Sequence, residues 1–529
     1  MLGKPDKRRR ARKGSANLFS SASIELELKF QVRPRDLVAI RANSIFAQRP
    51  AATLRSVYFD TADRDLHKRG FSLRVREQDG EFIQTVKRSR GLGLFDRDQW
   101  ECKIEGEKPD PLAWAGTAVA SILKGKRGNS LVQIFATTVA RSVGVIDEGG
   151  NFVEVSLDEG AISVNDLSEP VIELELELKG GDRSALFAIA RRLVADVSLI
   201  LSFESKAGRG FRLAGQNPLA ARKACAAEIL SGTSAAEAFP LIVLTCFDQI
   251  AGNAELLRRV RDSEVLHQLR VGLRRLRTAL TTFRPILPLN GFDRLKAEAK
   301  WLGGELDVAR NLDVLIKNTI HFGEAIVPAD ADLEALSTQL SAARAAAYKR
   351  VFRAIASRRF ANFLLDCAEW VELDGNQQND VRAVRRARDD DVRVFARRAL
   401  DQLSRRVRKK GKHLRTLEPT PRHELRIEAK KLRYAAEFFA DSFGHRASKR
   451  RKKFMVKLET LLDTLGQLND VSTAERTLTA GIGGQIEMTT GAGQLVRAQT
   501  RGEPQMVIDA DEAYAKWRRA KPFWRNKLN

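Results

Sequence analysis

Apolar and polar residues alternate along short runs through the first 215 residues of the chain. The clearest run, SIELELKFQV, occupies Ser23–Val32, and a near copy, VIELELELKG, occupies Val171–Gly180. Strict alternation predicts β-strands that have one polar face. Six further runs of this kind lie between these two, separated by Gly, Asp and Asn. Because so many short strands follow one another, we expect residues 23–215 to form an antiparallel barrel or a strongly curved sheet.

From about Ala220 onward the pattern changes to alanine, leucine and arginine at helical spacing. A predicted linker, 216–235, contains the change, and we expect residues 236–520 to be entirely helical. This region holds an internal repeat, HQLRVGLRRLRTAL from His267 and HELRIEAKKLRYAAEFF from His423. A repeat distance of 156 residues predicts two similar helical bundles. The expected fold class is therefore α+β with two domains, an antiparallel β-barrel followed by an all-α repeat of two bundles.

Charge is distributed unevenly along the 529 residues, whose formal net charge is +24. Residues 1–22 are basic and lack the apolar run of a secretory signal, so we expect a disordered basic tail. Gly14–Leu230 carries 30 basic and 29 acidic residues, whereas Val381–Thr460 carries 26 basic and 10 acidic residues. A near-neutral domain thus precedes a strongly basic one, which predicts a polyanionic partner for the helical half. Solubility is the simpler explanation of the same charge.

Cysteine spacing and hydropathy bear on the compartment of the protein. The four cysteines lie far apart and form no CxxC pair, which fits buried thiols in a reducing compartment better than disulfides or zinc ligands. We find no apolar run long enough to cross a bilayer, and the best candidate is FPLIVLTCF. We therefore expect a cytoplasmic protein that has no membrane partner.

Side chains two apart on a strand share a face, which gives the alternating runs a distinctive chemistry. Glu25, Glu27 and Lys29 point one way, while the residues between them point the other way. Arg74 and Arg76 share a face in the same manner. A solvent-exposed face would explain one such strand, but in a barrel these faces line one interior. Carboxylates and guanidinium groups that share one interior favour a metal-bound polyphosphate ligand. The guanidinium groups bind phosphate oxygens, and divalent cations between phosphate and carboxylates offset the repulsion of these two anions.

The ordered motifs of residues 23–215 resemble the CYTH family, or triphosphate tunnel metalloenzymes. The motifs are the Glu-x-Glu-x-Lys that begins at Glu25, followed by YFDT, LRVR, TVK, LDEG, ELELELK and SKAGRG. The resemblance implies phosphate ligands, which we divide into catalytic Lys29, Arg74, Arg76 and Lys87 and substrate-binding Arg55, Arg141 and Lys206. It likewise implies a divalent metal, Mg²⁺ or Mn²⁺, faced by the carboxylates of Glu25, Glu27, Asp158, Glu173 and Glu175.

Members of this family hydrolyse inorganic triphosphate or thiamine triphosphate, or cyclise ATP. The resemblance therefore implies metal-assisted attack of water on a terminal phosphorus, with the basic residues neutralising charge on the transferred group. No motif reads a base or a thiamine ring, so inorganic triphosphate is the expected substrate. Thiamine triphosphatase and adenylate cyclase activities are the alternatives. Loss of either Glu25 or Glu27 should abolish activity.

Each copy of the helical repeat carries a basic face beside an apolar face. In each copy four basic side chains fall within an arc of about 80°, and leucines fill the neighbouring arc. The two sets are His267, Arg270, Arg274 and Arg277, and His423, Arg426, Lys430 and Arg433. A solvated helix face would explain one copy, whereas recurrence in the same register predicts a binding groove for a long phosphate chain. Protonated histidine at its rim would strengthen binding at mildly acidic pH.

The two histidine-led motifs resemble the CHAD domain, a helical module that binds inorganic polyphosphate. This resemblance implies long-chain polyphosphate as a partner and an association with polyphosphate granules. Our leading hypothesis is a metal-dependent triphosphatase that splits inorganic triphosphate into pyrophosphate and phosphate and binds polyphosphate through its helical domain. The first alternative is a polyphosphate-binding protein that has little hydrolytic activity. Nucleic-acid binding is weaker, because aromatic residues make up only 7% of the chain and no groove-reading motif occurs.

Overall fold

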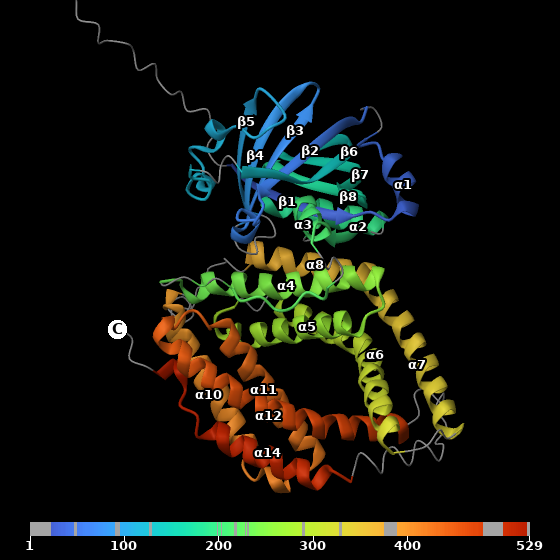
Figure 1. The fold of residues 1–529 in the computed structure, drawn as a ribbon, viewed down its shortest axis with the longest axis vertical. Coiled ribbons are helices and arrows are strands. Elements are labelled where there is room, and N and C mark those ends of the chain that lie inside the picture. The colour runs from blue at the N-terminus through green and yellow to red at the C-terminus, as the bar shows by residue number, and fades with distance from the viewer. Residues whose placement is uncertain are drawn as a thin grey trace, which may run out of the picture.

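The structure is a computed structural model of the 529-residue chain. The residues that it describes are 23–46, 50–89, 96–125, 130–197, 199–202, 204–215, 220–227, 229, 232–287, 291–326, 331–374, 389–479 and 501–525. The predicted basic tail, 1–22, lies outside them, as do several residues of the predicted linker, 216–235. A strand-rich first half rests on a helical second half (Figure 1). The predicted two-domain α+β fold class is confirmed.

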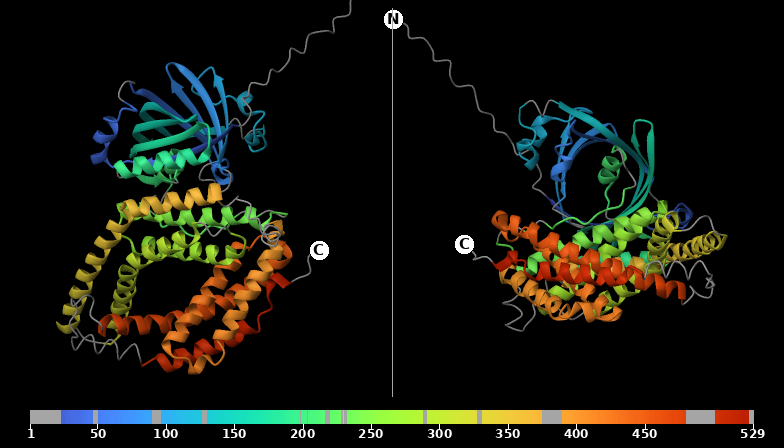
Figure 2. Two further views of the ribbon diagram at one scale, coloured as in Figure 1. Left: turned by 180° about the vertical axis from the view of Figure 1, so that it is seen from behind. Right: turned by 60° about the horizontal axis from the view of Figure 1, so that its bottom comes forward.

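One antiparallel sheet forms the first half. Its strands are β1 (Ser23–Gln31), β2 (Ala52–Thr61), β3 (Phe71–Gln78), β4 (Glu81–Ser89), β5 (Asp96–Ile104), β6 (Leu131–Glu148), β7 (Asn151–Val164), β8 (Leu167–Gly180) and β9 (Ile200–Ser202). They pair in the order β5-β4-β3-β2-β6-β7-β8-β1-β9, and β5 also pairs with β1, which brings the ladder back to its first strand. The right panel of Figure 2 shows these strands as a ring, which is the predicted barrel.

Alternation along β1 separates an apolar outer face from a polar inner face. Leu26, Leu28 and Phe30 of β1 are buried outside the ring, in one apolar cluster with α2 (Arg183–Asp196). Glu27 and Lys29, which lie between them, line the interior. Because side chains of a strand alternate between its two faces, the register that buries the apolar residues of β1 outside also turns its charged residues inside.

A short helix, α3 (Lys206–Leu213), lies inside the barrel (Figure 2, right panel). Its Phe211 packs with Tyr58 and Phe135 in an apolar cluster that fills part of the interior. The helix approaches the wall closely, because a Cβ atom at Gly210 would stand 2.2 Å from a ring carbon of Phe135. Only glycine fits there without moving the ring. The remaining interior is polar and forms the site described below. A further short helix, α1 (Leu37–Arg41), follows β1.

Long helices make up the second half. They are α4 (Ala235–Arg259), α5 (Ser263–Phe283), α6 (Phe292–Ile326), α7 (Ala331–Ile355), α8 (Arg358–Glu369), α10 (Val392–Lys410), α11 (Pro419–Phe438), α12 (Gly444–Thr479) and α14 (Glu503–Arg518). A capping box fixes the start of α4, where the Ser234 hydroxyl accepts a hydrogen bond from the Glu237 N–H and the Glu237 carboxylate accepts one from the Ser234 N–H. At the start of α5, the Asp262 carboxylate accepts hydrogen bonds from the N–H groups of Glu264 and Val265.

The two histidine-led motifs occupy equivalent helices. α5 packs between α4 and α6, and α11 packs between α10 and α12. The leucines of both motifs are buried, among them Leu269, Leu273, Leu425 and Leu432. α5 and α11 also contact each other, so the two copies of the repeat meet along their motif helices. The predicted all-α repeat is therefore present.

Among the described residues, α4 is long and apolar enough to cross a membrane by length and composition. Its most apolar window is 67% buried inside the protein. Ala238, Phe239, Ile242, Val243 and Phe247 of this helix all lie in the apolar core. Burial of this kind is typical of the core helix of a globular domain.

The two halves share one continuous apolar core. A single cluster contains Leu28 and Phe30 of β1, Leu186 of α2, and side chains of α4 and α8. Polar contacts reinforce the junction, since Arg191 of α2 donates to Asp366 of α8 at 2.5 Å and also contacts Glu369. Figure 1 shows the barrel lying directly over α4 and α8.

Candidate functional site

A cavity of about 350 Å³ occupies the polar part of the barrel interior. The predicted site residues that line it are Glu27, Lys29, Arg74, Arg76, Lys87, Arg141, Glu175 and Lys206. They come from β1, β3, β4, β6 and β8 and from the start of α3. Strand register brings them together, because Lys29 stands opposite Glu175 across the β1–β8 ladder. We call this space the barrel cavity.

The Lys206 ammonium group is the centre of one wall of the barrel cavity. Its Nζ lies 2.8 Å from Asp158, 2.6 Å from Glu173 and 2.8 Å from Glu175. The Lys206 side chain is only 11% exposed. Burial by itself would lower the pKa of Lys206, but the three carboxylates raise this pKa well above its usual value. Lys206 therefore stays protonated at neutral pH.

Arg141 reaches the same carboxylates from β6. Its Nε and Nη2 donate to Asp158, both at 2.6 Å, and Nη2 also donates to Glu175 at 2.6 Å. Burial opposes ionisation of Glu175, yet Lys206, Lys29 and Arg141 hold the pKa of this carboxyl well below its usual range. The pKa of Asp158 is lowered in the same way, against burial, by Lys206 and Arg141. This wall is therefore a set of ionised groups of both signs held by mutual attraction.

The β3–β4 side supplies a second wall that carries mostly cations. Arg74 and Arg76 of β3 and Lys87 of β4 line the cavity there. Arg74 Nη2 lies 3.9 Å from Glu101 Oε1, which is too far for a direct hydrogen bond. Arg74 Nε is buried and has no hydrogen-bond partner among the described residues. A buried guanidinium nitrogen in this state is expected where an anionic ligand binds.

The structure separates the five predicted metal-facing carboxylates. Glu27 and Glu175 line the barrel cavity. The side chains of Asp158 and Glu173 are fully buried and contact lysine and arginine groups. The backbone of Glu25 lies in β1, and its side chain is outside the described part of the structure. The buried pair therefore holds cations in place rather than facing the open cavity.

The donor chemistry around the barrel cavity fits a hard divalent cation, which prefers carboxylate oxygens. Three further carboxylates line it, those of Glu101, Glu154 and Glu177. Within the described ranges, no three His, Cys, Asp or Glu side chains converge as metal ligands do. Lys29 lies instead between two of the acids, 2.9 Å from Glu27 and 2.8 Å from Glu175. A cation bound by these two carboxylates would replace the Lys29 contacts.

Arg55 does not reach the barrel cavity. Tyr58 faces the cavity from β2, whereas Arg55 shares the opposite face of this strand with Val57, which packs in an outer apolar cluster. The Arg55 side chain is 45% exposed, and its Nη1 lies 4.0 Å from Glu77. The prediction that Arg55 binds substrate is therefore corrected: the two-residue period of β2 turns its side chain to the outside.

Several residues of the barrel cavity were missed by sequence reasoning. Gln99 and Glu101 line it from β5, and alternation within DQWECKI would have identified them once β5 was placed between β4 and β1. His67 also lines the cavity, and its ring stacks on Phe211 with centroids 4.0 Å apart. Burial lowers the pKa of His67. No local pattern reveals His67, because its contact depends on where α3 lies.

A second cavity, of about 590 Å³, lies between α5, α6 and α11. The predicted polyphosphate-binding residues that line it are Arg270, Arg274, Arg277, His423, Arg426 and Lys430. Three lysines that were not predicted join them, Lys296, Lys300 and Lys431. Lys296 and Lys300 are four residues apart and so share one face of α6, a signal that the sequence does contain. We call this space, defined by these nine residues, the basic cleft.

Positive charge in the basic cleft is poorly compensated. Asp307 pairs with Arg270, and no other acid is among the described residues that line the cleft. Burial, reinforced by Arg274 and Arg426, lowers the pKa of Lys430 to about 5. Burial and the neighbouring charges lower the pKa of Arg270 to about 10. Arg426 Nε is buried without a hydrogen-bond partner in the described part of the chain. Buried cationic groups of this kind have lost their contacts with water, and a bound anionic ligand would compensate that loss and stabilise their charged forms.

Two predicted polyphosphate ligands do not line the basic cleft. Arg433 pairs with Glu437 one turn later, at 2.8 Å. His267 lies close to the cleft, where burial and then Arg310 lower its pKa to about 4. A histidine with this pKa is neutral at mildly acidic pH. The expectation that His267 supplies a rim charge at such pH is therefore corrected for the unliganded protein.

Known proteins match the two halves separately. Residues 23–211 match the family model of the CYTH domain, and residues 241–479 match the family model of the CHAD domain. The chain is similar to an inorganic triphosphatase of Haemophilus influenzae, with 29% identity over 195 residues, which cover 36% of this chain and 54% of the relative. The chain therefore spans about half the length of that curated relative.

The second half is similar to a solved structure, the CHAD domain of the plant Ricinus communis. The sequence identity is 25%, the TM-score is 0.50, and the match covers 57% of this chain and 98% of that chain. The first family match ends within α3, which packs inside the barrel, and the second ends with α12. The chain therefore carries a CYTH domain, residues 23–211, followed by a CHAD domain, residues 241–479.

Proposed function

We propose that the barrel cavity binds inorganic triphosphate and hydrolyses it to pyrophosphate and phosphate, with Mg²⁺ or Mn²⁺ as cofactor. The observation that carries this proposal is a cavity in which Arg74, Arg76 and Lys87 stand on one wall and an ionised acid–base wall stands on the other. A small polyanion matches the first wall directly. The similarity to the inorganic triphosphatase of Haemophilus influenzae, 29% identity over 195 residues, supports this substrate.

The side chains of the barrel cavity would have different roles, some in binding phosphate oxygens and others in neutralising charge. Arg74 and Arg76 would hold phosphate oxygens through paired N–H groups, and Lys87 would act as a point charge. Lys206 and Arg141, which stay charged, would neutralise the negative charge that develops on the transferred phosphoryl group. Glu27 and Glu175, which line the cavity, would hold the divalent cation. When bound, such a cation polarises a phosphoryl oxygen and lowers the pKa of its water.

Phosphate release from triphosphate tests this function. The full-length protein should release phosphate with Mg²⁺ or Mn²⁺, and EDTA should stop the release. Arg74→Gln should lower kcat/KM roughly 100-fold, which is the usual cost of one charge-stabilising donor. Arg55→Gln is the matched control and should leave kcat/KM unchanged, because Arg55 faces outward. Equal effects of the two substitutions would contradict the assignment of the barrel cavity. Thiamine triphosphate and ATP, assayed in parallel, decide between the substrate classes.

We propose further that the basic cleft binds long-chain polyphosphate. The observation behind this is the cluster of nine cationic or histidine side chains that lines it around one acid. Competition between polyphosphate and RNA for the full-length protein tests the proposal. Polyphosphate should win at matched charge and salt concentration, and a preference for RNA would reverse the assignment. Arg426→Gln should weaken binding, whereas Arg433→Gln, outside the cleft, should not.

A further inference from the structure

The last turn of α4 touches the barrel through two side chains, Glu255 and Arg259. Arg259 Nη1 donates to Glu169 Oε1 of β8 at 2.9 Å. Gln31 of β1, two residues from Lys29, donates from Nε2 to Glu255 Oε1 at 2.5 Å. The two helix residues also contact each other, with Arg259 Nη2 and Glu255 Oε1 3.3 Å apart. The CHAD domain thus contacts two of the strands that carry the charged wall of the barrel cavity.

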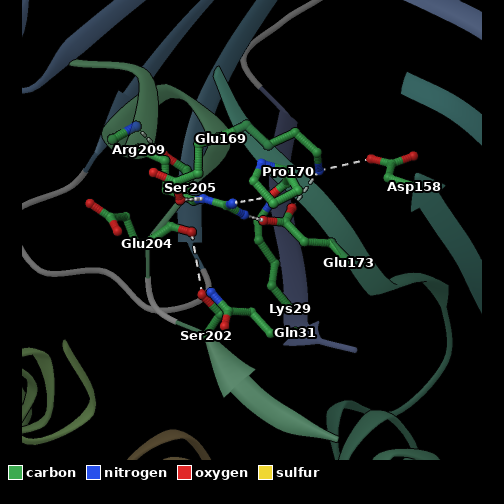
Figure 3. Close-up of polar contacts among 12 residues, drawn as sticks. Lys29, Gln31, Asp158, Glu169, Pro170, Glu173, Ser202, Glu204, Ser205 and Arg209 are labelled. Atoms are coloured by element: carbon green, nitrogen blue, oxygen red, sulfur yellow. Dashed lines mark hydrogen bonds and ion pairs between the residues drawn. The ribbon is translucent and has the colours of Figure 1, made fainter. Parts of the chain in front are cut away.

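From Glu169 the contacts continue inward to the cavity. Arg209 of α3 donates from Nε to Glu169 at 2.9 Å and from Nη1 to Glu173 Oε1 at 2.6 Å. The other oxygen of Glu173 lies 2.6 Å from the Nζ of Lys206, which lines the barrel cavity. Figure 3 shows Arg209 with Glu169 and Glu173 on its two sides. We call Arg259, Glu169, Arg209, Glu173 and Lys206 the ion-pair network.

The inner members of this network are removed from water. Glu173 is 0% exposed and Arg209 is 2% exposed. Removing one partner from buried charges leaves the remaining charge uncompensated, so neighbouring groups shift to restore the pairing. We therefore expect the loss of one partner to displace the neighbouring side chains, because solvent does not reach Glu173 and Arg209 to replace it.

Arg259 balances a competing arginine. Arg212 Nη2 donates to both oxygens of Glu169, at 3.1 Å to Oε1 and 3.0 Å to Oε2. Without Arg259, the Glu169 carboxylate would turn toward Arg212 and loosen its contact with Arg209. Arg209 would then hold Glu173 less tightly, and Lys206 would lose its fixed position among three carboxylates.

We propose that Arg259 of the CHAD domain is a positioning residue for the barrel cavity, acting through Glu169, Arg209 and Glu173 to hold the Lys206 ammonium group in place. This inference rests on the proposed triphosphatase function of the cavity. It makes the helical half a structural part of that site, even though no residue of the helical half lines the barrel cavity among the described residues.

Steady-state kinetics of full-length variants tests the role of Arg259. Arg259→Gln should lower kcat for triphosphate roughly tenfold or more, the usual effect of a second layer of contacts, with a much smaller change in KM. Arg259→Lys keeps a charge near Glu169 and should restore most of the lost kcat. An unchanged kcat in Arg259→Gln would overturn the proposal.

Arg191→Gln is the matched control. Arg191 spans the same junction through Asp366 and Glu369 but has no contact with the ion-pair network among the described residues. It should leave kcat within about twofold of wild type, because its pairing lies away from the cavity. An equal loss in Arg191→Gln and Arg259→Gln would assign the effect to weakened docking of the two domains and would refute the positioning role.

A second readout does not depend on turnover. The rate at which an amine-selective reagent labels Lys206, followed by mass spectrometry without substrate, should rise in Arg259→Gln and stay at the wild-type value in Arg191→Gln. An unchanged rate in Arg259→Gln would sink the inference. If the wild-type protein hydrolyses no triphosphate, the proposed function fails, while the labelling rates still decide whether Arg259 positions Lys206.

Discussion

Two buried lysines of this protein have environments that drive protonation in opposite directions. Lys206 lies against three carboxylates, which raise its pKa well above the usual value despite burial. Lys430 lies among Arg274, Arg426 and Arg270, and burial together with these charges lowers its pKa to about 5. The first lysine already has its counter-charges, whereas the second, among the described residues, has the charge of Asp470 opposed by those of three arginines. The basic cleft should therefore respond to pH, and the barrel cavity should not respond through Lys206.

Polyphosphate binding should be coupled to proton uptake by Lys430. The free protein holds this amine neutral above pH 5, and a bound phosphate raises its pKa, so the complex carries more protons than the free protein. Affinity should consequently rise as pH falls from about 8 toward 5, with uptake of about one proton per site at pH 7. Isothermal titration calorimetry in two buffers of different ionisation enthalpy measures this number directly.

The control for this measurement is a second lysine of the basic cleft. Lys430→Met should abolish the proton uptake, whereas Lys300→Met should weaken binding and leave the uptake in place. Uptake that persists in Lys430→Met would assign the proton to another group and would contradict this prediction.

At the scale of the element, the periodicity of a segment predicted whether it forms a strand or a helix and which of its faces is polar. Strict alternation in β1 and β8 identified both strands and the face on which Glu27, Lys29 and Glu175 stand. The helical repeat likewise identified α5 and α11. Arg55 was misplaced because a motif gives spacing along the chain, while the face of a strand follows from which neighbours are buried.

The position of α3 could not be predicted from the sequence. Its eight residues contain two glycines and show no long apolar stripe, so nothing local indicates a helix inside a barrel. The helix is held there by contacts from distant strands, namely Phe211 with Phe135 and Arg209 with Glu173. Residues that depend on α3, such as His67, were missed for the same reason.

Gly210→Ala tests the close packing of α3 against the barrel wall. The new methyl group would overlap the Phe135 ring, so we expect a loss of about 1–3 kcal/mol in the free energy of unfolding. Gly303→Ala, in α6, meets no atom within 4 Å and should be neutral or stabilising by up to about 1 kcal/mol. Urea unfolding of both variants measures the difference. A neutral Gly210→Ala would mean that α3 does not pack tightly inside the ring.

At the scale of the whole molecule, the CYTH and CHAD domains are joined by a common apolar core. The cluster that contains Leu28, Phe30 and Leu186 continues into α4 and α8 without a break. Domains joined only by a linker unfold independently, whereas a shared core makes each depend on the other. The arrangement also explains how Arg259 comes to lie within reach of the barrel.

Differential scanning calorimetry tests this dependence. We expect one heat-absorption peak for the full-length protein, because melting of either half removes the apolar partner of the other. Arg191→Gln should lower the temperature of that single peak without splitting it. Two peaks in the wild-type protein, each with the enthalpy of one half, would show that the halves melt separately.

The common core also limits how the molecule can be shortened. Division at the predicted linker, 216–235, would leave the outer leucines of β1 and the apolar side of α2 bare on one fragment, and the matching sides of α4 and α8 bare on the other. Surfaces of that kind cause recombinant fragments to self-associate. An isolated barrel is therefore a poor substitute for the intact polypeptide, and poor yield or low turnover of such a fragment would reflect its uncovered flank rather than its chemistry.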